Sequence, residues 1–277
     1  MASIDSAPQP VRMFLWTVPR SVSTAFERCM SGLGNVALVH EPYTTAYYFG
    51  PDRKFLNTPF LPVEHDYSYA KVKAMMEAEF YEKDYVFGKD HAYSLDERYD
   101  SIPDGFIHTI LIRDPARALA SFYDVCNMPI LRYYSILKHV LPEGYAFKQL
   151  YDLYEHLKST TDREPVILDS DDLLRYPEQM IRRYCEAIGV PFNTSMLDWD
   201  PQVNVTQSWA SSLKLMQHIG VYEKALKSTS FNVRHQPKQV DVLSLPAEYQ
   251  HAIKVSQPFY DKLYEKRLIP EDRETEV

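Results

Sequence analysis

The sequence has few cysteines, no long apolar segment and no excess of positive charge, and each of these features excludes a class of protein. Its three cysteines, Cys29, Cys126 and Cys185, are widely separated and form no C-x-x-C pair. We therefore expect packed, reduced thiols instead of a disulfide framework or a zinc site. No segment approaches the roughly 20 apolar residues that a membrane span requires, so no membrane association is expected.

The net charge and the first residues exclude two further classes, general nucleic-acid binders and secreted proteins. The formal net charge of −8 argues against a general nucleic-acid binder, because binding to a phosphate backbone needs a positive face. The segment 1–12 lacks the basic flank and apolar run of a secretory signal, so the expected location is cytoplasmic. A local basic pocket stays compatible with this composition.

Apolar runs alternate with helical segments along most of the chain. This order predicts a single α/β domain with a central, mainly parallel sheet flanked by helices. We expect a flexible leader at 1–10, the domain at 11–270 and a C-terminal tail at 271–277. Strands are expected at 11–16, 35–40, 85–90, 106–112 and 165–169. Helices are expected at 23–34, 68–83, 129–140, 145–159, 177–189, from Pro115 onward, and at 244–268 with an interruption near Pro258.

The loop after the first strand lacks the residues of a nucleotide-binding P-loop. TVPRSVSTAFERC, 17–29, contains neither glycine nor lysine, whereas a Walker-type loop needs glycines around the phosphates and a lysine that reaches them. It does place Arg20, Ser21, Ser23 and Thr24 between a strand and a helix, where free helix amides attract an anion. The alternative is that the hydroxyls only cap the helix while Arg20 forms a surface ion pair.

Two further segments repeat this arrangement of cations after strands. RDPARALASFY, 113–123, places Arg113 directly after an apolar strand and Ser121 on the following helix, which predicts a second phosphate site. Lys89 and His91 in GKDHAY follow another strand. In open α/β folds ligands bind at the carboxyl edge of the sheet, so these residues are expected near one site.

In this combination and order, the segments resemble the sulfotransferases that use 3′-phosphoadenosine 5′-phosphosulfate (PAPS). Pro19–Thr24 is similar to the P-K-S-G-T-T loop for the phosphosulfate, and Arg113-Asp114-Pro115 with Ser121 is similar to the segment for the 3′-phosphate. Lys89-Asp90-His91 is similar to a K-T-H strand end. The similarity extends through 166–192. It implies a P-loop NTPase-like architecture and a cofactor-binding set of Arg20, Ser21, Val22, Ser23, Thr24, Ala25, Arg113 and Ser121.

The resemblance also implies a reaction in which a sulfuryl group moves from PAPS to a hydroxyl or amine of a small molecule, leaving adenosine 3′,5′-bisphosphate (PAP). Arg20 and Lys89 would stabilise charge on the leaving phosphate, and no metal is required. His91 is the preferred general base, as the resemblance places it there. Glu41, after the second strand, is its competitor, with a helix cap or an ion pair to Arg20 as the structural alternative.

The sequence departs from the cytosolic branch of that family. Arg20 replaces a lysine and Val22 replaces a glycine, although other branches have arginine at the first position. The C-terminal R-K-G segment is absent, and Arg234 or Lys238 are the candidates to replace it.

An aromatic- and proline-rich stretch, 43–62, is expected to form an ordered loop or lid. Its aromatic side chains suggest an apolar or amphipathic acceptor, although core packing is the more common role of such residues. Trp209 is a candidate to stack on adenine or on the acceptor. The aromatic set is Tyr43, Tyr47, Tyr48, Phe49, Phe55 and Phe60.

Two other functions stay open. One is a P-loop kinase for a small molecule, and the other is a non-catalytic protein that binds PAPS or PAP. Assembly as a homodimer is also open.

Overall fold

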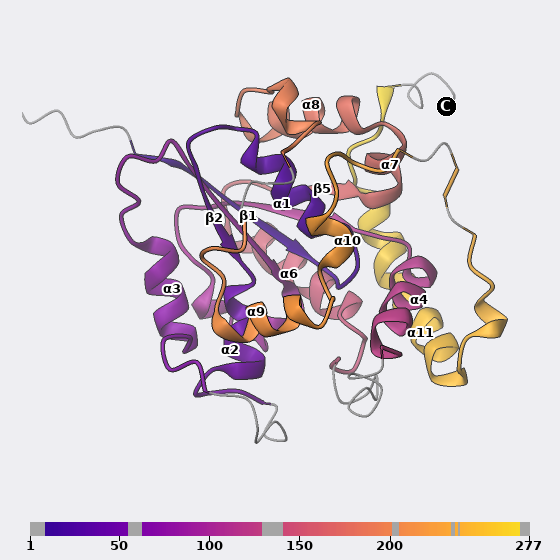
Figure 1. Ribbon diagram of the computed structural model, residues 1–277. Helices are drawn as coiled ribbons and strands as arrows, with labels where there is room; N and C mark the ends of the chain where they lie inside the picture. The colour runs from indigo at the N-terminus through magenta and orange to yellow at the C-terminus, as the bar shows by residue number, and fades with distance from the viewer. Residues whose placement is uncertain are drawn as a thin grey trace, which may run out of the picture.

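Five parallel strands form a sheet at the centre of the protein, with helices on both sides (Figure 1). The computed structural model describes residues 9–54, 63–128, 141–200, 205–233, 236–237 and 239–271. The strand order is β2-β3-β1-β4-β5, and every neighbouring pair is parallel. This arrangement confirms the predicted α/β fold. The strands are β1 Val11–Thr17, β2 Val36–His40, β3 Tyr85–His91, β4 Ile107–Ile112 and β5 Val166–Asp169.

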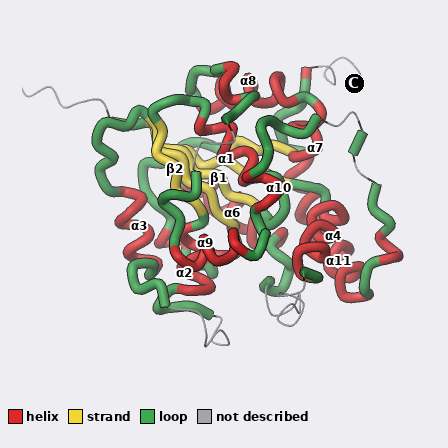
Figure 2. Tube along the Cα trace, viewed as in Figure 1, coloured by secondary structure: helices red, strands yellow, loops and turns green. Residues whose placement is uncertain are grey.

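Helices connect the strands and cover the sheet (Figure 2). They are α1 Ser23–Ser31, α2 Pro42–Phe49, α3 Tyr69–Glu77, α4 Pro115–Cys126, α6 Phe147–Thr160, α7 Ser170–Arg175, α8 Pro177–Ile188, α9 Ser211–His218, α10 Glu223–Leu226 and α11 Ala247–Tyr264. Short 3₁₀ turns lie at Ala92–Leu95, Tyr99–Ser101, Thr194–Met196 and Val242–Ser244. None of the helices within these ranges is long and apolar enough to cross a bilayer.

The central strand β1 is buried on both faces, which explains its continuous apolar sequence. Met13 and Leu15 belong to a core with side chains of α1, α7 and α8. Phe14 and Trp16 face the opposite way and pack in a second core with side chains of α2, α3, α4, α6 and α11. Successive side chains of a strand point to opposite faces, so both layers of helices are anchored on one strand. Cys29, Cys126 and Cys185 are buried and form no disulfide with one another.

The strand register brings the predicted polar residues to one edge of the sheet. Thr17 at the end of β1 pairs with His91 of β3, and His40 of β2 pairs with Lys89. On the other side Thr17 pairs with Leu111 of β4. The loops that follow these strands therefore lie next to one another, because parallel strands end in the same direction.

The prediction of a loop throughout 43–62 was wrong in its first part, where the structure has helix α2. Pro42 occupies the first turn of this helix, which suits its fixed φ. The helix amides of Tyr43 and Thr44 donate to the carboxylate of Asp90, which lies on β3. A capping group 46 or 47 positions away in the chain cannot be recognised from a local pattern. Phe55 and Phe60 lie outside the described residues.

Two helix boundaries also differ from the prediction. Helix α3 ends at Glu77, well before residue 83. Helix α11 continues through Pro258 without the expected interruption. Ile253, Tyr260 and Leu263 are buried on both sides of the proline, so tertiary packing offsets the missing backbone hydrogen bond. The predicted helix at 129–140 lies outside the described residues, and the leader, domain and tail boundaries stay predictions.

Candidate active site

The loop between β1 and α1 contains no glycine, yet the backbone of two of its residues adopts the left-handed conformation. Arg20 has φ 68° and Val22 has φ 61°. A left-handed conformation costs a non-glycine residue about 1–2 kcal/mol, so the surrounding structure must hold it. No side chain caps α1, whose first backbone bond runs from Phe26 N to Val22 O. The amides of 23–25 thus have no acceptor within the helix, and the alternative of serine or threonine caps is wrong here.

Buried hydroxyl groups brace this strained loop against the sheet. Thr17 Oγ1 contacts the Ser21 hydroxyl and donates to the carbonyl oxygen of Leu111 at 2.8 Å. Ser170 Oγ lies 2.7 Å from the carbonyl oxygens of both Ser21 and Ile112. Ser21 therefore ties the loop to the sheet, and its hydroxyl is already hydrogen-bonded to Thr17.

The structure brings Arg20, Arg113 and Ser121 together, although they are far apart in the sequence. Arg20 Nε donates to Ser121 Oγ at 3.2 Å, and Arg20 Nη1 donates to the carbonyl oxygen of Val221 at 3.3 Å. Arg113 is buried and donates from Nη1 to the backbone carbonyl of Arg20. The two predicted phosphate sites are thus parts of one basic site at the N-termini of α1 and α4.

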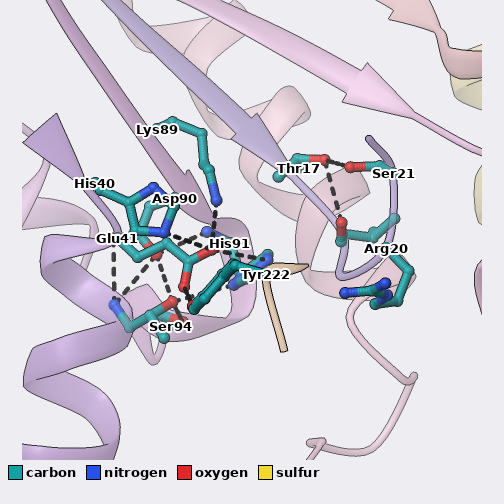
Figure 3. Close-up of polar contacts among 12 residues, drawn as sticks. Thr17, Arg20, Ser21, His40, Glu41, Lys89, Asp90, His91, Ser94 and Tyr222 are labelled. Carbon is teal, nitrogen blue, oxygen red and sulfur yellow. Dashed lines mark hydrogen bonds and ion pairs between the residues drawn. The ribbon is translucent and has the colours of Figure 1, made fainter. Parts of the chain in front are cut away.

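Glu41 lies at the centre of a second group of polar side chains (Figure 3). Its Oε1 pairs with the Nζ of buried Lys89 and lies 3.8 Å from His91 Nε2. Its Oε2 accepts a hydrogen bond from the Tyr222 hydroxyl at 2.8 Å. Glu41 itself has φ 48° and precedes α2. The alternative of a direct ion pair to Arg20 is not what the structure shows, since Lys89 occupies that role.

The charges in this group shift its pKa values. Burial alone would raise the pKa of Glu41, but Lys89, His91 and His40 outweigh it and hold the pKa of this carboxyl well below its usual range. Burial lowers the pKa of His91 to about 4, although Glu41 pulls in the opposite direction. At neutral pH the site therefore contains an ionised Glu41 and a neutral His91 imidazole.

A group of aromatic rings packs beside the same side chains. His40 stacks on Trp209 with ring centroids 3.8 Å apart, and Tyr222 meets both rings edge-on. His40 Nδ1 contacts Glu27, while its Nε2 lies 3.7 Å from Glu41 Oε1. Trp209 was considered from the sequence as a stacking platform for adenine or the acceptor, but in this structure its partner is His40. No sequence signal indicated Tyr222 or His40.

The aromatic residues proposed to line an acceptor pocket are mostly part of the core. Tyr43 is fully buried and donates to the carbonyl oxygen of Ser101. Tyr47 and Phe49 are also buried, and the Tyr48 hydroxyl contacts that of Tyr93 at 3.0 Å. Arg234 and Lys238, the predicted C-terminal cations, lie outside the described residues.

Two curated proteins of Arabidopsis thaliana are similar to this chain at low identity. A branched-chain-amino-acid aminotransferase-like protein 2 of Arabidopsis thaliana is 26% identical over 233 residues, covering 78% of this chain and 35% of that protein. Branched-chain-amino-acid aminotransferase-like protein 1 of the same organism is 24% identical over 271 residues, covering 92% of this chain and 42% of that protein. The chain thus spans less than half the length of these curated relatives.

Two solved sulfotransferase structures are similar to this chain at low identity. The sulfotransferase domain from the curacin biosynthetic pathway is 13% identical, with a TM-score of 0.48, covering 90% of this chain and 98% of that domain. Mouse sulfotransferase SULT7A1 complexed with PAP is 11% identical, also with a TM-score of 0.48, covering 94% of this chain and 90% of that chain.

A family model gives the assignment directly. The model described as a sulfotransferase domain matches residues 11–261, a range that includes all five strands and both basic loops. The chain therefore belongs to the sulfotransferase domain family.

Proposed function

We propose that this protein transfers a sulfuryl group from PAPS to a hydroxyl or amine of a small-molecule acceptor. The observation that supports it most is the joint placement of Arg20, Arg113 and Ser121 beside the uncapped N-terminus of α1. A donor with a 5′-phosphosulfate and a 3′-phosphate carries two anionic groups, and this site offers two arginines and free helix amides. Membership of the sulfotransferase domain family supports the same class of reaction.

The residues present suit this donor. The first-turn amides of α1, Arg20 and the hydroxyls of Ser23 and Thr24 would bind the phosphosulfate, and Ala25 would contribute its amide. Arg113 and Ser121 would bind the 3′-phosphate. Val22 contributes the left-handed turn that aims the amides. These assignments combine charge, hydrogen-bond donors and a helix N-terminus, and require no metal.

In the proposed reaction the acceptor oxygen or nitrogen attacks sulfur and forms the new bond. The bond between sulfur and the 5′-phosphate oxygen breaks, PAP leaves with the electron pair, and a base takes the acceptor proton. Arg20 and the amides would stabilise the charge on the leaving phosphate. Lys89 supplies further positive charge, although in this structure it is paired with Glu41.

His91 remains our preferred base over Glu41. Both oxygens of Glu41 are engaged, by Lys89 and Tyr222, and its low pKa makes it a weak proton acceptor. His91 is neutral near pH 7, its pKa being lowered to about 4, and its side chain is 12% exposed, compared with 3% for Glu41. In this proposal Glu41 orients Lys89 and His91 electrostatically.

The first experiment is calorimetric titration of the protein with PAP, with ATP and magnesium as the comparison ligand. Binding of PAP without magnesium supports the donor class, and binding of ATP alone would favour the kinase alternative instead. A second step supplies PAPS with a panel of hydroxylated and amine acceptors and follows PAP release. PAP binding without transfer to any acceptor would favour the non-catalytic alternative.

A further inference from the structure

The strand end Lys89-Asp90-His91 carries an aspartate where the resembling family motif has a threonine. The Asp90 carboxylate is fully buried. It accepts hydrogen bonds from the backbone amides of Tyr43, Thr44 and His91, and from the hydroxyl of Thr44 at 2.6 Å. Its oxygens thus face donors only.

The Thr44 hydroxyl connects this carboxylate to the imidazole of His91. Thr44 Oγ1 lies 2.6 Å from Asp90 Oδ1, 2.9 Å from Ser94 Oγ and 3.1 Å from His91 Nδ1. A hydroxyl has one proton to donate but two lone pairs that accept. Its shortest contact is the one to the carboxylate, and charge-assisted hydrogen bonds are both shorter and stronger than neutral ones. The Thr44 hydroxyl therefore donates its hydrogen bond to Asp90.

The direction of this bond decides the proton on His91. With its own proton directed to Asp90, Thr44 Oγ1 can only accept from the ring, so His91 Nδ1 must carry a hydrogen. In a neutral imidazole the other nitrogen, Nε2, then has the lone pair. His91 Nε2 is the nitrogen that faces Glu41, at 3.8 Å.

The geometry points to Thr44 as a positioning residue that, together with Asp90, fixes His91 in the Nδ1–H tautomer and leaves Nε2 free to accept a proton. Asp90, Thr44 and His91 form a relay in which a hydroxyl stands between carboxylate and imidazole. The same Asp90 caps α2, so the helix that carries Thr44 and the strand that carries His91 are held in register. The catalytic consequence rests on the proposed function, but the tautomer does not.

The direct test is nitrogen NMR of protein labelled with ¹⁵N-histidine. Burial and the nearby Glu41 raise the pKa of Asp90 to about 7, so spectra are recorded near pH 8, where Asp90 is ionised. The signals of His91 are assigned by comparison with His91→Gln. We expect a protonated Nδ1 and an unprotonated Nε2 in the wild type. A protonated Nε2 in the wild type overturns the inference, whether or not any acceptor is sulfated.

Two substitutions separate the relay from simple packing. Thr44→Val removes the hydroxyl and is expected to abolish the preference of His91 for the Nδ1–H tautomer. Thr44→Ser keeps the hydroxyl and should keep that preference. Ser94→Ala removes the serine hydroxyl that contacts Thr44 Oγ1 and serves as the matched control. The His91 signals should be unchanged in this variant. An unaltered tautomer in folded Thr44→Val overturns the inference. If Thr44→Val does not fold, the wild-type spectrum still decides.

Once an acceptor is known, the rate gives a further readout. Thr44→Val is expected to lower kcat by about 10-fold or more. The loss should be smaller than that from removing the base itself, since a general base contributes about 10²–10⁴-fold. The KM for PAPS should change little. Thr44→Ser is expected to restore most of the rate. Equal kcat values in Thr44→Val and wild type would contradict the catalytic consequence.

Discussion

Arg113 donates a hydrogen bond from its guanidinium to the backbone carbonyl of Arg20, 93 residues earlier in the chain. The contact ties the loop after β4 to the loop after β1 and holds Arg20 in its left-handed conformation. Arg113 therefore has two roles in the proposed site, as a cation for the donor and as a brace for the phosphosulfate loop.

Arg113→Ala should weaken PAP binding by at least about tenfold, since it removes a charge-assisted bond of roughly 1.5–3 kcal/mol. Arg182→Ala is the matched control, as that arginine lies on helix α8, where it forms an exposed pair with Glu178 and stacks on Phe192. Calorimetry with PAP measures both variants. Unchanged affinity in Arg113→Ala would place the 3′-phosphate elsewhere.

His91→Ala should leave PAP binding intact and abolish transfer, because it removes the proposed base but no donor for the phosphates. Loss of a general base lowers the rate by about 10²–10⁴-fold. The pH profile of kcat/KM should show an acidic limb near pH 4, the lowered pKa of His91, instead of its ordinary value. Retained transfer in His91→Ala with loss in Glu41→Ala would move the base to the carboxylate.

Lys89→Met should destabilise the protein by about 3–5 kcal/mol, since the buried Glu41 carboxylate would lose its cation. Lys89 and Glu41 side chains are 0% and 3% exposed, so solvent cannot replace the pair. The double variant Lys89→Met with Glu41→Leu should recover part of the loss. Chemical denaturation measures all three proteins, and equal stability of the single and double variants would argue against an uncompensated charge.

Buried His108 should make stability decrease in acid. It accepts a hydrogen bond at Nδ1 from Trp16 Nε1 at 3.1 Å, and burial lowers its pKa to about 4. The unfolded chain, with a histidine pKa of about 6.5, binds the proton more readily. The contribution of His108 to stability is therefore present above pH 6.5 and lost as the pH falls toward 4, by up to about 3 kcal/mol.

The control for this pH effect is His108→Gln, which keeps an acceptor for Trp16 but does not titrate. Denaturation curves of both proteins between about pH 7 and 4.5 give the difference in slope. Parallel curves would mean that His108 is protonated equally in the folded and unfolded states.

The main elements of the fold could be predicted from local patterns. Apolar runs mark each of the five strands, and Pro177 and Gly189 bound helix α8 as expected, with Gly189 in the left-handed region at φ 77°. Such signals are short-range: a helix start, a helix stop or a strand needs only neighbouring residues. They sufficed for the class of fold and for the two basic loops.

The sequence by itself determined which side chains follow which strands, and so which of them reach the carboxyl edge of the sheet. Only the tertiary structure decided their partners. Tyr222 reaches Glu41 across 181 residues, and Asp90 caps a helix that begins 48 residues before it. Hydrogen bonds depend on distance and direction in space. A carboxylate at 41 can therefore be recognised as a candidate from the sequence. The cationic groups that lower its pKa and the proposed relay that orients His91 depend on how the layers pack.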